Sequence, residues 1–71
     1  MSVQLIPVSD FYAADSFSIT IANRDYVAGL FAGGYTIGKL VQDDMVEVIE
    51  TGIETERKAA NAITRFDAKL A

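Results

Sequence analysis

The stretch Tyr26–Val41 (YVAGLFAGGYTIGKLV) decides the fold, because it is apolar, contains four glycines and fits two different structures. As a helix, it would carry small residues four apart, and these would form a flat track that another backbone can approach. The small pairs are Ala28 with Ala32, Gly29 with Gly33, and Gly34 with Gly38. As strands, it would be a β-hairpin that turns at Gly33-Gly34, since adjacent glycines supply positive φ. Periodicity alone does not separate helix from hairpin in so short an apolar run.

The residues before this stretch, 1–25, have the pattern of extended structure. Ser16–Ala22 alternates apolar and hydroxyl side chains with the period of a half-buried strand. Val3–Val8 is a candidate edge strand, because Pro7 cannot donate to a central ladder. Between them, Asp10–Asp15 is expected to form a turn or a short helix, and Asn23 a turn or a helix entry.

The residues after it, 43–70, are expected to form one long amphipathic helix. Their apolar side chains recur at spacings of three and four. Asp44 stands where an N-cap belongs, and Glu47 follows three residues later as in a capping box. A helix of roughly 27 residues would reach ~40 Å, longer than a domain of this mass is wide, so part of it would need another chain.

This helix also has an imperfect seven-residue repeat, which is typical of a coiled-coil seam. One register contains Ile49, Glu56, Ile63 and Leu70, and the other contains Met45, Gly52, Ala59 and Phe66. Glu56 and Gly52 interrupt the seam, and an amphipathic helix packed on its own domain is the simpler interpretation. The acidic face of the helix (Asp43, Glu47, Glu50 and Glu54) is interpreted as a solvated surface that could cover a basic partner.

Composition restricts both the size and the partners of the fold. The chain has 71 residues and a net charge of −4, with neither Cys nor His, so disulfides and the usual zinc sites are excluded as stabilising staples. A domain of this size buries only ~60% of its unfolded surface. Good packing or oligomerisation must therefore supply stability. The acidic balance argues against nucleic acid as a partner.

No motif in the sequence is complete enough to indicate catalysis, a cofactor or a metal site. Gly33–Lys39 has the GxxxxGK spacing of a phosphate-binding loop, but Leu40 stands where the Mg²⁺-binding hydroxyl belongs. The serines have no imidazole base, and no thiol is present. Glu47, Glu50 and Glu54 lack the further ligands of an EF-hand or a di-iron site. We expect no enzyme activity, no cofactor and no metal.

The sequence thus predicts one α+β domain over 1–71, made of short N-terminal β segments, the glycine-rich segment 26–41 (helix or hairpin) and the long C-terminal helix. We expect a non-enzymatic structural subunit that self-associates, as in an oligomer, a filament or a virion-type particle. Alternatives are a small acidic inhibitor of another protein and, less favoured, a membrane-associated protein that uses 26–41. No secretory signal is seen, and a soluble or particle-associated protein is favoured over a membrane-spanning one. The expected self-association residues are Ala28, Gly29, Ala32, Gly33, Gly34, Gly38, Ile49, Ile53, Ala59, Ala60, Ile63, Phe66 and Leu70.

Overall fold

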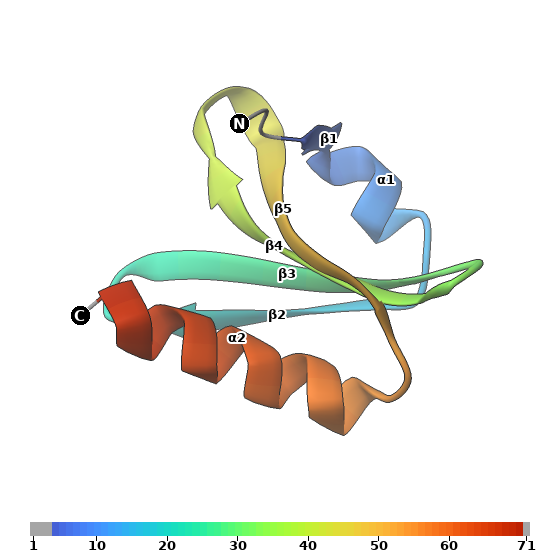
Figure 1. Ribbon diagram of the computed structural model, residues 1–71. Helices are drawn as coiled ribbons and strands as arrows, with labels where there is room; N and C mark the ends of the chain where they lie inside the picture. The colour runs from blue at the N-terminus through green and yellow to red at the C-terminus, as the bar shows by residue number, and fades with distance from the viewer. Residues whose placement is uncertain (1–3, 71) are drawn as a thin grey trace.

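A computed structural model describes residues 4–70 and confirms the α+β class (Figure 1). Five strands and a C-terminal helix form the body of the fold, and two shorter helical segments lie between strands. The elements, in chain order, are β1 (Leu5–Pro7), α1 (Val8–Tyr12), β2 (Ser16–Ile21), β3 (Arg24–Phe31), β4 (Gly34–Val41), the 3-10 turn η1 (Gln42–Asp44), β5 (Met45–Ile53) and α2 (Glu56–Leu70).

The glycine-rich segment is the β-hairpin of the two alternatives, so the helix interpretation of 26–41 is wrong. β3 and β4 pair antiparallel from Tyr26 opposite Lys39 to Phe31 opposite Gly34, with Ala32 and Gly33 in the turn. Strands satisfy their backbone through neighbours, so the glycines do not carry the cost that four glycines would have in a lone helix. The hairpin forms the centre of one antiparallel sheet with the order β1-β5-β4-β3-β2.

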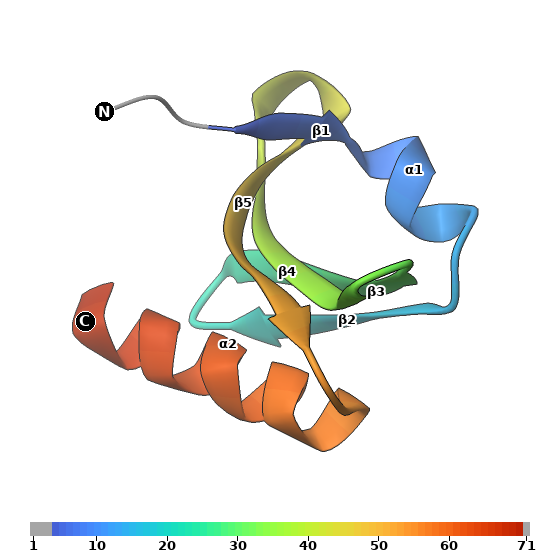
Figure 2. The ribbon, with the colours of Figure 1, turned by 45° about the vertical axis from the view of Figure 1, so that its right-hand side comes forward.

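The sheet bends strongly along the paired strands β4 and β5, so that β1 and β2 lie at opposite sides of the molecule (Figure 2). The β4–β5 register shifts between Tyr35 and Ile37 and again between Ile37 and Gly38. Gly38 marks the bend, because a Cβ there would lie 2.8 Å from the carbonyl oxygen of Glu47 and would also strike Val46. Only glycine permits this approach of the two backbones.

The two faces of the sheet carry separate apolar cores. On one face α2 covers a cluster whose fully buried members include Tyr26, Ala28, Ile37 and Ile63. On the other face α1 covers a smaller cluster of Phe11, Val27 and Val46. Alternation along β3 explains the division, since Tyr26 and Ala28 point to α2 and Val27 points to α1.

Gly29, two positions after Val27 and on the same face of β3, makes room for α1. A Cβ at Gly29 would lie 3.1 Å from the ring of Phe11, so the missing side chain lets that ring reach the sheet. There Phe11 meets Phe31 edge to face, with ring centroids 5.3 Å apart. One aromatic residue of α1, Phe11, therefore packs this short helix against the sheet.

The C-terminal amphipathic helix is confirmed, but its expected first half is corrected: 45–53 is the strand β5. This segment contains Val46, Val48, Ile49, Thr51 and Ile53, and β-branched side chains favour strands. The expected cap at Asp44 is likewise wrong, and the helix begins instead after Thr55, whose Oγ1 accepts a hydrogen bond from the backbone N–H of Lys58 at 3.1 Å.

The helix α2 is shorter than the helix expected for 43–70, so no part of it needs a second chain because of its length. The fifteen residues of α2 span ~22 Å, which fits a molecule with extents of 31 × 27 × 24 Å. The seven-residue seam is wrong as well, because Ile49, Met45 and Gly52 belong to β5 while Ile63 and Phe66 belong to α2. The projecting coiled-coil helix does not exist.

The N-terminal expectations are mostly confirmed. β1 is an edge strand that ends at Pro7, and β2 follows the alternation predicted for Ser16–Ala22; Val3 lies outside the described residues. The short helix is present but covers Val8–Tyr12 rather than Asp10–Asp15. The β2–β3 turn consists of Ala22 and Asn23, with φ of 50° and 68°, the signs of a type I′ hairpin turn.

Candidate interaction surface

β2 is a free edge of the sheet, since among residues 4–70 it pairs only with β3. The N–H of Leu30 donates to the carbonyl of Asp15 at 2.9 Å, which fixes Asp15 and Leu30 as a hydrogen-bonded pair of the ladder. Antiparallel ladders alternate, so Phe17, Ile19 and Ile21 also bond to β3. The backbone groups of the intervening residues, Ser16, Ser18 and Thr20, therefore point away from the sheet.

β2 lacks the features by which proteins usually protect an edge strand. Its sequence, SFSITI, has no charge, proline, glycine or bulge. The other open stretches differ: β1 has three residues and ends at Pro7, and the part of β5 beyond its pairing with β1 contains Glu50 and the positive-φ Gly52. Within the described chain, β2 is the edge best suited to accept another strand.

The two faces of β2 differ in chemistry. Phe17, Ile19 and Ile21 are half-buried against the α2 core, where the ring of Phe17 meets that of Tyr35 at 6.3 Å. The opposite face presents the exposed hydroxyl residues Ser16, Ser18 and Thr20. Figure 1 shows β2 as the last strand of the sheet, with α2 alongside it. An added strand would cover apolar surface on one face and meet hydroxyls on the other.

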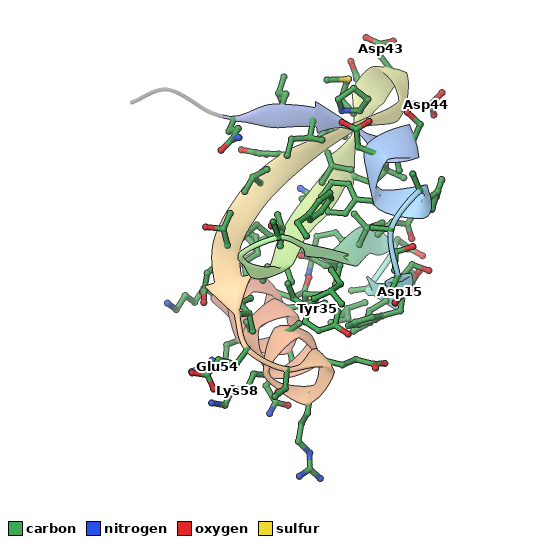
Figure 3. The ribbon with its side chains drawn as sticks, turned by 90° about the vertical axis from the view of Figure 1, so that its right-hand side faces the viewer. Asp15, Tyr35, Asp43, Asp44, Glu54 and Lys58 are labelled. Atoms are coloured by element: carbon green, nitrogen blue, oxygen red, sulfur yellow. The ribbon has the colours of Figure 1, made fainter. Side chains whose placement is uncertain are left out.

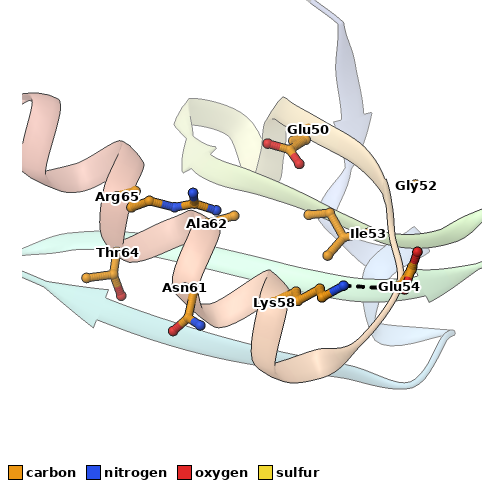
Figure 4. A pocket seen from close by; sticks show the side chains of 9 residues that line it. All are labelled: Glu50, Gly52, Ile53, Glu54, Lys58, Asn61, Ala62, Thr64 and Arg65. Atoms are coloured by element: carbon orange, nitrogen blue, oxygen red, sulfur yellow. Dashed lines mark hydrogen bonds and ion pairs between the residues drawn. The ribbon is translucent and has the colours of Figure 1, made fainter.

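A second surface is the groove between β5 and α2 (Figure 4). Its β5 wall carries Glu50, and its α2 wall carries Arg65; Lys58 pairs with Glu54 at 3.4 Å where the chain enters the helix. The groove opens to solvent along its length. Small-molecule sites instead enclose most of their ligand between apolar walls. This groove therefore lacks the form of an enclosed ligand pocket.

A buried ionic cluster fastens α2 to the sheet. Asp67 is only 4% exposed, and its carboxylate accepts hydrogen bonds from Arg24 Nε at 2.6 Å and Nη2 at 3.1 Å. The hydroxyl of Tyr26 donates to the same carboxylate at 2.6 Å. These bonds join the last turns of α2 to the start of β3.

The cluster shifts the protonation equilibria of its members. Hydrogen bonds from Arg24 and then Tyr26 hold the pKa of the Asp67 carboxyl below its usual value, against the effect of burial. Burial, and next the hydrogen bond to Asp67, raises the pKa of Tyr26. The bond to Asp67 also raises the pKa of Arg24 above its ordinary value. All three groups are thereby fixed in their neutral-pH forms.

Sequence reasoning missed this cluster. A signal was present: Asp67 stands within the apolar stripe of α2, beside Phe66 and four residues after Ile63. A carboxylate on a buried stripe requires a partner. The partner could not be named, because Arg24 is 43 positions away in the chain.

The residues expected at a self-association surface lie mainly inside the single chain. Ala28, Ile53, Ala59 and Ile63 belong to the α2 core, and Phe66 packs on its rim. Gly29 lies beneath Phe11. The remaining members are in the hairpin turn or against β5 (Ala32, Gly33, Gly34, Gly38), half-buried on the molecule (Ile49, Ala60) or exposed near the end of α2 (Leu70). The track of small residues thus packs closely within the sheet, and the part of these residues in self-association stays a prediction.

The expected acidic face is divided by the strand structure. Asp43 lies in the turn at one end of the molecule and Glu54 at the other, beside Lys58 (Figure 3). Glu47 and Glu50 lie between them along β5. Among residues 4–70, no three acidic side chains gather as a metal site would require. The binding of a basic partner stays a prediction without a continuous acidic surface to support it.

The helix that would have inserted into a membrane is not formed by residues 26–41. Residues 26–41 are two strands of the sheet, with Ala28 and Ile37 in its core. No helix within residues 4–70 has both the length and the apolar character needed to cross a bilayer.

Comparison with known proteins gives no information on the function of this chain. No protein-family model matches the sequence, and neither the curated proteins nor the solved structures give a match.

Proposed function

We propose that this protein is a non-enzymatic assembly subunit that self-associates, and that it does so through the free edge of β2. The observation that carries the proposal is the outward direction of the backbone groups of Ser16, Ser18 and Thr20 on an uncharged strand. Unpaired strand edges bind other strands through main-chain hydrogen bonds.

The size of the chain supports the same proposal. It has no cysteine and no histidine, and within residues 4–70 only five large side chains are fully buried: Phe11, Tyr26, Ile37, Val46 and Ile63. Several large apolar residues remain half-exposed at the rim of the α2 core, including Phe17, Ile19 and Ile21 on β2. Pairing at this edge covers them and adds stability that a small core lacks.

The test is the molecular mass in solution across a concentration series, measured by sedimentation. The unaltered chain is expected to exceed the monomer mass at micromolar concentration. Ser18→Lys places a charge at the centre of the edge, so its dissociation constant should rise at least ~10-fold. Thr51→Lys, an equal change at an exposed position of β5, should leave self-association unchanged. A monomeric unaltered chain, or equal weakening by both variants, would contradict the proposal.

A further inference from the structure

We infer that the partner on β2 is β2 of a second copy, in an antiparallel pairing centred on Ser18. This inference rests on the proposed function and specifies its geometry. Each copy carries a net charge of −4, so two copies repel one another in general. The uncharged strip from Ser16 to Ile21 is where this repulsion opposes contact least.

The direction of the backbone groups selects the register. An edge pairing forms hydrogen bonds only between residues whose N–H and C=O point outward. With Ser18 opposite Ser18 of the second copy, Ser16 faces Thr20, and all outward residues of both copies are paired. A shift by two positions in either direction leaves one of these residues unpaired on each copy.

The same register matches the side chains. On the α2 side, Phe17 of each copy faces Ile19 of the other in a closely spaced, non-hydrogen-bonded pair. On the opposite side, the serine and threonine side chains of the two β2 strands face one another, so no like charges lie directly opposite within the strand pair.

The antiparallel pairing of β2 with β2 gives a closed dimer. Both copies use the same strand, so the interface has two-fold symmetry and no β2 edge is left for a third copy. The opposite edge of the sheet is the short β1 with Pro7. A dimer with one continuous sheet therefore follows, rather than a filament grown from repeated strand addition.

Single-cysteine variants test the register cleanly, because the chain has no cysteine of its own. Cα atoms of a hydrogen-bonded antiparallel pair lie ≈ 5.5 Å apart, which is within the range of a disulfide. Ser18→Cys should therefore form a disulfide dimer under mild oxidation with oxidised glutathione. Ser16→Cys or Thr20→Cys alone should react at least ~10-fold more slowly, since like positions are then ~13 Å apart. A mixture of these two should join to each other.

The outcomes separate the register from the proposed function. Thr51→Cys is the control for random collision, and circular dichroism confirms that each variant is folded. If sedimentation shows a dimer but Ser16→Cys joins Ser18→Cys in preference to Thr20→Cys, the register is shifted and this inference fails while the proposed function stands. Self-linking of Ser16→Cys would indicate parallel strands or an antiparallel pairing centred on Ser16, and either would also refute it. A monomeric mass for the unaltered chain refutes both.

Discussion

Arg24 holds Asp67 in a two-pronged ion pair, with Nε at 2.6 Å from one carboxylate oxygen and Nη2 at 3.1 Å from the other. Arg24 opens β3, and Asp67 lies in the last turns of α2. A carboxylate near a helix C-terminus opposes the helix dipole, so the helix alone does not favour Asp67 there. The bonds from Arg24 and Tyr26 explain its position.

Replacing Asp67 with Asn should destabilise the protein more than replacing Glu54 with Gln. The Asp67 carboxylate is buried with Arg24, and loss of its charge leaves the guanidinium without its counter-ion. The exposed pair of Glu54 with Lys58 contributes at most ~1 kcal/mol. Urea unfolding of both variants checks the order, and equal stability would show that the buried pair adds nothing.

Asp67 should also make stability depend on pH in acid. Its pKa is lowered in the folded protein, so its contribution is complete above the unfolded value near 4. The contribution is lost as pH falls through the folded pKa. The difference in unfolding free energy between the unaltered chain and Asp67→Asn should shrink below about pH 4. A difference that is constant from pH 7 to pH 2 would contradict this cause.

Tyr26 should make the stability of the protein depend on pH in alkali. Its pKa is raised, so its contribution is complete below about pH 10 and is lost as pH rises through the folded value. Tyr26→Phe should cost about 1–2 kcal/mol at pH 7, since it removes a hydrogen bond to a carboxylate. The variant should also lose the part of the alkaline destabilisation that Tyr26 causes. Thermal unfolding from pH 7 to pH 11 measures both effects, and an unchanged alkaline limb would assign it to other groups.

The bend at Gly38 should not tolerate a side chain. Gly38→Ala places a Cβ 2.8 Å from the carbonyl oxygen of Glu47, so β4 and β5 must separate, at a cost of about 1–3 kcal/mol. Gly33→Ala is the matched control: a Cβ there meets no atom within 4 Å, and its φ is not positive. The control should be neutral or stabilising by up to ~1 kcal/mol. Equal losses in denaturant would argue against crowding at the bend.

The strands and helix were predictable where one pattern dominated. The alternation in Ser16–Ala22 identified β2, and the stripe through Ala59, Ile63 and Phe66 identified α2. The segment 45–53 was misassigned because spacings such as Ile49 to Ile53 suit a helix, whereas its β-branched content favours the strand that forms. The interruption at Gly52 was visible in sequence, and it is a positive-φ position near the end of that strand.

The interaction surface was harder to predict than the elements. Glycines that suit close contact between helices also suit a bent sheet, and only the paired structure shows that Gly38 meets β5. β2 was recognised as a strand, but its position at the edge depends on strand order, which arises from contacts distant in sequence. A chain this small still gains stability from a partner, and the contact that we propose lies on β2.

Hydrogen exchange of individual amides, followed by NMR at rising protein concentration, tests self-association through β2 most directly. The amides of Phe17, Ile19 and Ile21 bond to β3 and should be protected at every concentration. Those of Ser16, Ser18 and Thr20 should exchange rapidly when dilute and become protected at least ~10-fold as the protein associates. Association without protection of these outward amides, or rapid exchange of these amides at every concentration up to the millimolar range, would contradict the account.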